Sequence, residues 1–302
     1  MVDVYTQRIL DAFTKGEKQK QEHVRRYLVD RRANYVPGHP HTIQALSRAG
    51  QLDWAAANSR CRVDAAEILA SELPAFRKQH RTRSPLVHSV LVAPLKWCRP
   101  IGVAHEVEIE AIRAELESLL AGRNYFGAIE PGLYPRRTPS GEFQKGVVSW
   151  HAHAVVWNDR EHSTIAAVQS INAQNEGPLF GVAPANYRRR SWETIAKPLL
   201  YALKTPGKSY ATRRIPESIN RQTGEIIPEH DQQQAQRLRP GELVKMLNVL
   251  REFTLDELLV VGGNGYDLVA PLRDRISRDR ERLRSGYARL NLTDPLLRGA
   301  LA

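Results

Sequence analysis

One stretch of the chain decides its fold: Val147-Val148-Ser149-Trp150-His151-Ala152-His153-Ala154-Val155-Val156-Trp157. Side chains on a β-strand point alternately to opposite faces, so His151 and His153 point the same way, about 6.5–7 Å apart along the chain. At that separation two imidazoles can converge on one cation. The opposite face carries Trp150, Ala152, Ala154 and Val156. We therefore predict a strand that gives one face to the core and presents a histidine pair on the other.

Strand and helix patterns alternate on both sides of this stretch. Residues 86–93 are a short apolar run that ends before Pro94, which favours a buried strand. The remaining expected elements are a helix at 104–121, a strand at 125–130 that pairs with the histidine strand as a long-looped hairpin, a helix at 163–172, a strand at 179–183 and a helix at 192–203. The order β-α-β-β-α-β-α predicts an α+β fold, with an antiparallel central sheet of ferredoxin-like character and helices on one face.

The two ends of the chain have the patterns of helical additions to this core. We expect a helical N-terminal region at 1–82, a core domain at 83–212, and a linker with a helical C-terminal region at 213–302. Within the C-terminal region we expect a small hairpin near Gly224, a Gln-rich linker at 232–236, and helices from Pro240 onward, through 258–261 and the charged run 273–284.

The composition points to a polyanionic partner. Among 302 residues, 44 Lys and Arg outnumber 33 Asp and Glu, which gives a net charge of +11 and makes nucleic acid the first partner to consider. Cys61 and Cys98 lie in unrelated contexts, which excludes a disulfide framework and a four-cysteine zinc site and fits a reducing cytoplasm. The N-terminus lacks the pattern of a signal peptide, and no uncharged apolar run approaches the about 20 residues of a membrane span, so neither export nor a membrane role is indicated.

A third metal ligand is needed to complete a site around the histidine pair. Glu130 ends the neighbouring strand, and its carboxylate together with two imidazoles would leave positions open for a phosphate oxygen and water. Glu130 is equally compatible with an ordinary strand-end role, and His162 or His88 could serve instead. A second His-x-His, at His39-Pro40-His41, lies in a Pro/Gly loop that does not fix the ring directions.

A tyrosine stands apart from the apolar stripe of the 192–203 helix. Trp192, Ile195, Leu199 and Leu203 form that stripe, whereas Tyr201 falls on the other side, near Lys197 and Lys204. A phenol is protonated at neutral pH, so as a nucleophile it needs nearby positive charge or a metal-polarised electrophile. A solvent-side tyrosine between lysines can also be a plain surface residue, and Pro198 allows the helix to begin there.

These two elements resemble the signatures of the HUH endonuclease superfamily. His151-Ala152-His153-Ala154-Val155-Val156 looks like its H-hydrophobic-H motif, and Tyr201-Ala202-Leu203-Lys204 resembles its Y-x-x-K motif. The apolar strand at 86–93 matches the position of the first motif of the superfamily, and Glu130 is similar to the arrangement in single-tyrosine rolling-circle replication initiators. The resemblance covers roughly residues 84–206.

The resemblance implies an enzyme that nicks and joins single-stranded DNA on a ferredoxin/RRM-like fold. Mg²⁺ or Mn²⁺ held by His151, His153 and Glu130 would polarise the scissile phosphate, and Tyr201 would attack it and keep a 5′-phosphotyrosine. Lys204 would stabilise negative charge on the phosphoryl oxygens. The expected partners are single-stranded or hairpin origin DNA of a plasmid or phage-like element, with a host helicase and polymerase, since the chain has no G-x-x-x-x-G-K-[ST] loop.

The chain departs from related families in ways that leave alternatives open. Some plasmid initiators carry a glutamate one turn before the tyrosine, whereas this chain has Lys197 there and Glu193 a further turn back, so its termination chemistry is open. A third histidine typical of relaxases does not follow Trp157, and small transposases lack such long terminal regions. A transposase or relaxase-like strand transferase, and a non-catalytic nucleic-acid-binding protein, remain the alternatives.

Basic clusters flank the predicted site. Arg188-Arg189-Arg190 directly precedes the tyrosine helix, and Arg136-Arg137 lies in the loop after Glu130. Both clusters, together with Lys197, could contact the phosphates beside a cleavage site, or they could be solvated faces.

Overall fold

The computed structural model describes residues 2–30, 45–46, 51–82, 86–135, 146–158, 161–178, 182–219, 224–227 and 230–293. In chain order its elements are α1 (Val4–Asp30), α4 (Ser59–His80), β1 (Val87–Val92), η2 (Leu95–Trp97), β2 (Cys98–Pro100), η3 (Ile101–Glu106), α5 (Ile109–Leu119), β3 (Asn124–Tyr134), β4 (Val147–Trp157), α6 (Glu161–Gln174), β5 (Ala185–Arg190), η4 (Trp192–Thr194), α7 (Ala196–Tyr201), β6 (Lys208–Ile215), β7 (Ser218–Ile219), β8 (Ile226–Ile227), β9 (His230–Arg237), α8 (Pro240–Leu250), η5 (Asp256–Leu258), β10 (Leu259–Gly262) and α9 (Gly265–Thr293).

The central sheet is mixed. Its strand order is β5-β1-β4-β3-β6-β9, with β10 also paired to β3 and β2 to β4, while β7 and β8 form a separate pair. The expected α+β class is confirmed. A wholly antiparallel sheet is not what forms, because β6 joins β3 in the parallel direction at Leu133 and Ser209. A helix, α7, separates β6 from the preceding strand β5, and this connection lets β6 enter the sheet with the direction of β3.

The hairpin at the centre of the sheet is confirmed. β4 pairs with β3 in an unbroken antiparallel register from Val147 opposite Tyr134 to Trp157 opposite Asn124. β3 continues past Glu130, where we expected it to end, because Pro131 and Gly132 both take places in the ladder. The hairpin is therefore longer than predicted, and its pairing extends to Tyr134 and Val147.

Apolar side chains fill both sides of the sheet, so the expectation of helices on one face is wrong. On one side α5, α6 and α8 pack on even-numbered β4 residues such as Trp150 and Ala152. On the other, α4, α7 and α9 pack on Val155 and Trp157. Two helices from the terminal regions, α4 and α9, thus cover the face opposite α5 and α6. Trp150, Trp157 and Trp192 are all buried.

Three expected elements have a different structure. The Gln-rich segment 232–236 belongs to β9, which pairs along its whole length with β6; main-chain bonds can support a strand of any polar composition. Residues 259–262 form strand β10 on β3 instead of a helix, since a short apolar run buried on both faces suits either state in isolation. The fourth strand of the core is Ala185–Arg190, not 179–183, of which 179–181 lie outside the described residues.

Two expected helices are shorter than predicted. The segment 104–121 contains a 3₁₀ turn, η3, and then α5 from Ile109 to Leu119. The segment 192–203 begins as the 3₁₀ turn η4 and becomes α7 only at Ala196, two residues before Pro198. A proline fits in a first helical turn because the N–H that it lacks has no helical partner there.

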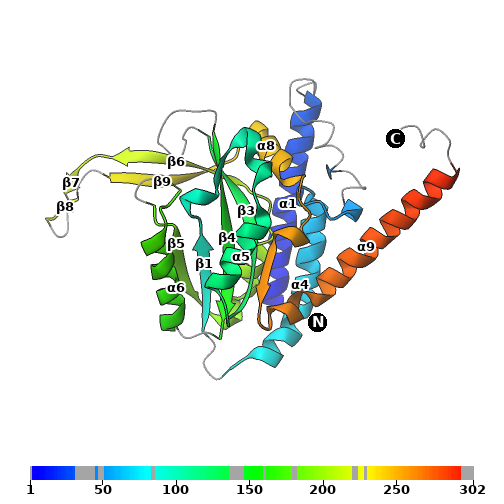
Figure 1. Ribbon diagram of the computed structural model, residues 1–302, viewed down its shortest axis with the longest axis horizontal. Coiled ribbons are helices and arrows are strands. Elements are labelled where there is room, and N and C mark those ends of the chain that lie inside the picture. Colours follow the sequence, from blue (N-terminus) through cyan, green and yellow to red (C-terminus); the bar gives the residue numbers. More distant parts are fainter. Residues whose placement is uncertain are drawn as a thin grey trace.

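The terminal regions contact the core. α1 and α4 pack on each other and on α7, and β10, from the C-terminal region, adds a strand beside β3. β6 and β9 extend outward from the sheet, with β7 and β8 beyond them (Figure 1). Among the described helices, none has both the length and the hydropathy that crossing a bilayer requires.

Candidate metal and tyrosine site

The site begins with three side chains on two neighbouring strands. In the register of β3 and β4, Glu130 lies directly opposite His151, and His153 lies opposite Ala128. Residues directly opposite each other on paired strands share a face, and so do residues two apart on one strand. Glu130, His151 and His153 therefore project from the same side of the sheet, which is the side that α4 and α7 cover.

The three side chains converge closely enough to hold one ion. Glu130 Oε1 lies 2.8 Å from His153 Nε2 and 3.4 Å from His151 Nε2. One nitrogen from each imidazole and one carboxylate oxygen lie within 4.8 Å of one another, and among the described residues this is the group with metal-ligating geometry. Two imidazoles and a carboxylate form a facial donor set that leaves further coordination positions open. The donors thus fit a divalent metal ion.

The environment of His151 prepares its ring for a ligand role. Its Nδ1 lies 3.2 Å from the carbonyl oxygen of Ser149, which can only accept, so a proton on Nδ1 would leave the Nε2 lone pair for a cation bound beside Glu130. Gly132 gives this ring its space, because a Cβ there would lie 3.1 Å from His151 Cε1 and 3.2 Å from Tyr210 Cε2. Gly132 faces the same side as Glu130, two residues away.

Charge and burial set the protonation states. Burial alone would raise the pKa of Glu130, but the Lys204 ammonium and the two imidazoles hold that pKa well below 4.5, so the carboxylate is ionised. Burial lowers the pKa of His153, against the opposing effect of Glu130. A neutral imidazole is the form that binds a metal. At neutral pH the cluster therefore offers an ionised carboxylate and a neutral His153 imidazole.

Tyr201 and Lys204 reach this cluster from α7. The Tyr201 ring lies edge-on to His153, with 5.6 Å between ring centroids, and the tyrosine is 41 % exposed. Lys204 Nζ is 2.8 Å and 2.9 Å from the two oxygens of Glu130 and 3.9 Å from the centroid of the Tyr201 ring. The prediction that Tyr201 leaves the apolar stripe is confirmed, and residues from distant parts of the chain meet in one place.

A buried arginine holds the turn that follows the tyrosine helix. Arg62 of α4 is 2 % exposed and donates from Nη1 to the carbonyl oxygens of Leu203, at 2.8 Å, and Lys204, at 3.0 Å. Its Nε donates to the carbonyl of Ala56 at 2.8 Å. Leu203 and Lys204 follow the last residue of α7, so this guanidinium satisfies the carbonyls of the turn after the helix and holds the backbone of Lys204 in place.

A second buried contact comes from α1. Glu17, 1 % exposed, accepts hydrogen bonds from the backbone N–H and the hydroxyl of Thr205, and from Lys20 Nζ at 2.7 Å. Lys20 donates in turn to the carbonyl of Thr205 at 2.6 Å. Thr205, the residue after Lys204, is thus held at both its backbone N–H and its carbonyl. Sequence reasoning missed Arg62, Glu17 and Lys20, because their partners lie far along the chain and no local spacing marks them.

The predicted DNA-contacting arginines divide between the two faces. In the register of β1 with β4 and β5, Arg188 and Arg190 lie on the face of His153, and Arg189 on the opposite face, 3.8 Å from Glu161 of α6. Arg188 and Arg190 are exposed. Lys197 is exposed in the first turn of α7 and, among the described residues, forms no hydrogen bond or ion pair with the cluster. Arg136 and Arg137 lie outside the described residues.

The alternative ligands do not join the cluster. His88 pairs with Val156 and so faces the other side of the sheet, packed near Tyr187. His162 is exposed on α6, and His39 and His41 lie outside the described residues. Glu193 is the last acidic residue before Tyr201 in the sequence. Its carboxylate accepts hydrogen bonds from the hydroxyl of Ser191 and, at 3.4 Å, from Arg81.

Three comparisons bear on what this site belongs to. No protein-family model matches the chain, and neither a curated protein nor a solved structure does.

Proposed function

We propose that the protein nicks and joins single-stranded DNA through Tyr201, with a divalent ion, Mg²⁺ or Mn²⁺, held by Glu130, His151 and His153. One observation carries the proposal: the Tyr201 ring lies 5.6 Å from the ring of His153, beside Lys204, and His153 belongs to the metal-ligating group found among the described residues. A nucleophile and a cation site need this proximity, because both must touch the same phosphate.

The fold supports the same proposal. The order β5-β1-β4-β3, reached by a β-α-β-β-α-β path through α5 and α6, is compatible with a ferredoxin-like core inside the larger mixed sheet. It supports the resemblance to HUH endonucleases that the His-x-His and Y-x-x-K motifs suggest. Rolling-circle replication initiation, on single-stranded or hairpin origin DNA in the cytoplasm, is the use that this resemblance favours.

In the reaction, the phenol oxygen of Tyr201 forms a bond to phosphorus and its proton passes to solvent. The bond from phosphorus to the 3′ oxygen breaks, and the released 3′ oxygen takes a proton from water. A bound divalent ion supplies polarisation of the phosphate and charge stabilisation. Lys204 neutralises charge next to the nucleophile, and Glu130 holds both Lys204 and the imidazoles in position. Attack by a 3′ hydroxyl on the phosphotyrosine reverses the steps and joins strands.

Exposed cations beside the site support a path for the flanking strand. Arg188 and Arg190 lie on the face of His153, two strands away. Arg190 Nε donates to Ser89 Oγ at 3.1 Å, which leaves its other donors available for phosphate oxygens. Arg189 lies on the opposite face and is not part of this path.

A denaturing-gel assay tests the proposal. The protein, a Tyr201→Phe variant and a Tyr266→Phe variant are each incubated with single-stranded and hairpin DNA and Mn²⁺, and then with chelator. Tyr266 is a matched control because it is 48 % exposed, against 41 % for Tyr201. DNA labelled at its 3′ end should become attached to the wild type and the Tyr266 variant, and DNA labelled at its 5′ end should be released with an extendable 3′ hydroxyl.

Two results would overturn the proposal. Attachment of DNA to the Tyr201→Phe variant would rule out Tyr201 as the nucleophile. An absence of attachment by the wild type over a broad set of hairpin sequences would favour a non-catalytic nucleic-acid-binding protein instead.

A further inference from the structure

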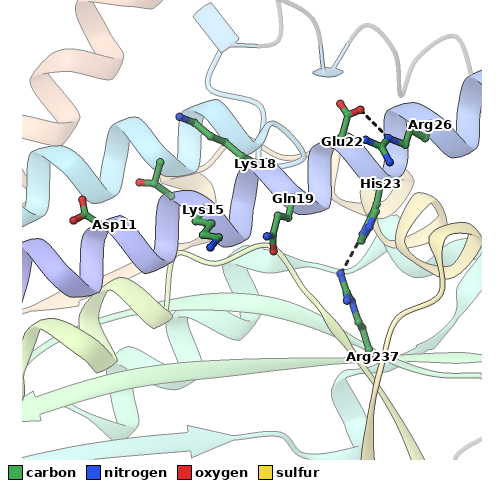
Figure 2. A pocket seen from close by; sticks show the side chains of 9 residues that line it. Asp11, Lys15, Lys18, Gln19, Glu22, His23, Arg26 and Arg237 are labelled. Carbon is green, nitrogen blue, oxygen red and sulfur yellow. Dashed lines mark hydrogen bonds and ion pairs between the residues drawn. The ribbon is translucent and has the colours of Figure 1, made fainter.

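A groove runs along the exposed side of α1, between that helix and the end of β9. One part of it is a hollow of about 670 Å³ whose lining includes Lys15, Lys18 and Arg26. A second hollow continues it and shares Gln19, His23 and Arg237 with the first. In Figure 2, His23 of α1 and Arg237 of β9 point toward each other across the groove, joined by the hydrogen bond at 3.1 Å.

The groove carries an excess of positive charge. Its first part has the cations Lys15, Lys18, Arg26 and Arg237 against Asp11 and Glu22. Glu22 is occupied by Arg26 at 2.9 Å and by Arg25 at 3.3 Å. Lys15, Lys18 and Arg237 are exposed and face this hollow. A site for a small apolar ligand is lined mainly by apolar and aromatic side chains, whereas this lining is polar and cationic and suits a polyanion.

The groove leads directly to the tyrosine segment. Lys20 and Gly207 line its second part, and Lys20 Nζ binds the carbonyl of Thr205, the residue after Lys204. The backbone at Gly207 approaches Lys20 so closely that a Cβ there would lie 3.3 Å from Lys20 Cε. A strand that leaves the Tyr201 and Lys204 region along this segment therefore enters the groove.

We propose that this groove binds the sugar-phosphate backbone of single-stranded DNA that leads away from the nucleotides at Tyr201. The proposal rests on the proposed function, because that function brings the strand to Tyr201. Lys15 and Lys18 lie one helical turn apart, about 5–6 Å between Cβ atoms, and so can contact neighbouring phosphates. The α1 helix then has two roles: Glu17, on its buried side, holds Thr205, and its exposed side binds substrate.

Binding is measured without cleavage, in a Tyr201→Phe background and with chelator. The probe is fluorescent oligothymidylate of about 30 nucleotides, longer than common single-strand sites. The groove variant is Lys15→Ala/Lys18→Ala/Arg237→Ala. The control variant, Arg273→Ala/Arg278→Ala/Arg284→Ala, removes as many exposed cations from α9. Circular dichroism verifies that both variants are folded.

The groove variant should raise the Kd at least about tenfold and lower the slope of log K against log salt by about 2, since each phosphate contact contributes about 0.7. The control variant should change the Kd less than about threefold. Unchanged affinity in the groove variant, or an equal loss in both variants, would overturn the groove as a binding site. Since this readout involves no cleavage, it is separate from the attachment assay: attachment can fail while the groove binds, and the groove can fail while attachment persists.

Discussion

The two halves of the candidate site are held in place by different means. Glu130, His151 and His153 lie on β3 and β4, whose register is unbroken from end to end. Tyr201 and Lys204 lie on or just after α7, which has 6 residues. A helix of this length has little stability of its own. It is held by the packing of its buried residues and, just beyond its end, by the bonds of Leu203 to Arg62 of α4 and of Thr205 to Glu17 of α1. The strand half is thus built from local contacts and the helix half from remote ones.

The largest expected effect tests whether Glu130, His151 and His153 bind a metal ion independently of Tyr201. His153→Ala removes one of the three proposed metal ligands, so the affinity for Mn²⁺ should fall at least about 100-fold, which exceeds the loss typical of removing a residue that only hydrogen-bonds to a ligand. Titration calorimetry or Mn²⁺ electron paramagnetic resonance measures it. His162→Ala, which removes an exposed histidine from α6, should leave the affinity unchanged. Mn²⁺ binding should also survive Tyr201→Phe; if it does not, the two halves are not separable.

The next prediction concerns the helix half. Arg62→Met leaves the carbonyls of Ala56, Leu203 and Lys204 without their donor, so the free energy of unfolding should fall by about 1–3 kcal/mol. Urea unfolding measures this. Attachment of DNA should slow while Mn²⁺ affinity stays the same. Arg60→Met is the matched control: Arg60 is half exposed, pairs with Asp64, and should change stability by about 0.5 kcal/mol or less. Equal loss in both variants would contradict a special role for Arg62.

A smaller effect on Mn²⁺ affinity is expected from a substitution at Gly132, which packs tightly against the His151 ring. Gly132→Ala places a Cβ 3.1 Å from His151 Cε1, and the ring must move by a few tenths of an ångström. Mn²⁺ affinity should weaken by about threefold to tenfold, since ligand orientation is disturbed but no ligand is lost. Gly102→Ala is the control, because nothing lies within 4 Å of its Cβ position. An undisturbed Mn²⁺ affinity in Gly132→Ala would show that His151 is not held in this orientation.

The smallest effect tests how α1 is attached to α4. Asp3 accepts from the N–H and the hydroxyl of Thr6, at 2.9 and 2.8 Å, and lies 3.2 Å from Arg77 of α4. Burial alone would raise the pKa of Asp3, but these partners lower it below 3.8. A lowered pKa stabilises the fold above that pH, and the stabilisation is lost as the pH falls through the folded-state value.

Asp3→Ala should therefore reduce stability by about 1 kcal/mol at neutral pH, as for other helix-start residues, and the difference from wild type should shrink below pH 3.8. Thermal unfolding at several pH values measures it. Asp11→Ala, on the exposed side of the same helix, should show no such dependence. A difference that stays constant into acid would mean that the Asp3 charge contributes nothing.

The same division explains what could be predicted from the sequence. The alternation of one strand is enough to pair His151 with His153, and helical spacing is enough to separate Tyr201 from the apolar stripe. The contacts of Arg62 could not be predicted, because its bond to Leu203 spans 141 residues of the chain and no sequence period links the two residues. For the same reason the Gln-rich segment of β9 was expected to be a linker. Its sequence has no strand pattern, and it forms a strand because it pairs with β6.

The parallel rung between Leu133 and Ser209 has a consequence for the fate of a cut strand. It anchors the chain soon after Lys204 to the same strand that carries Glu130, so the segment with Tyr201 is tethered at a short distance from the ion ligands. In the proposed reaction, a DNA end attached to Tyr201 could not diffuse away. Its local concentration near the site would stay high, as for any short tether, and resealing would compete well with escape.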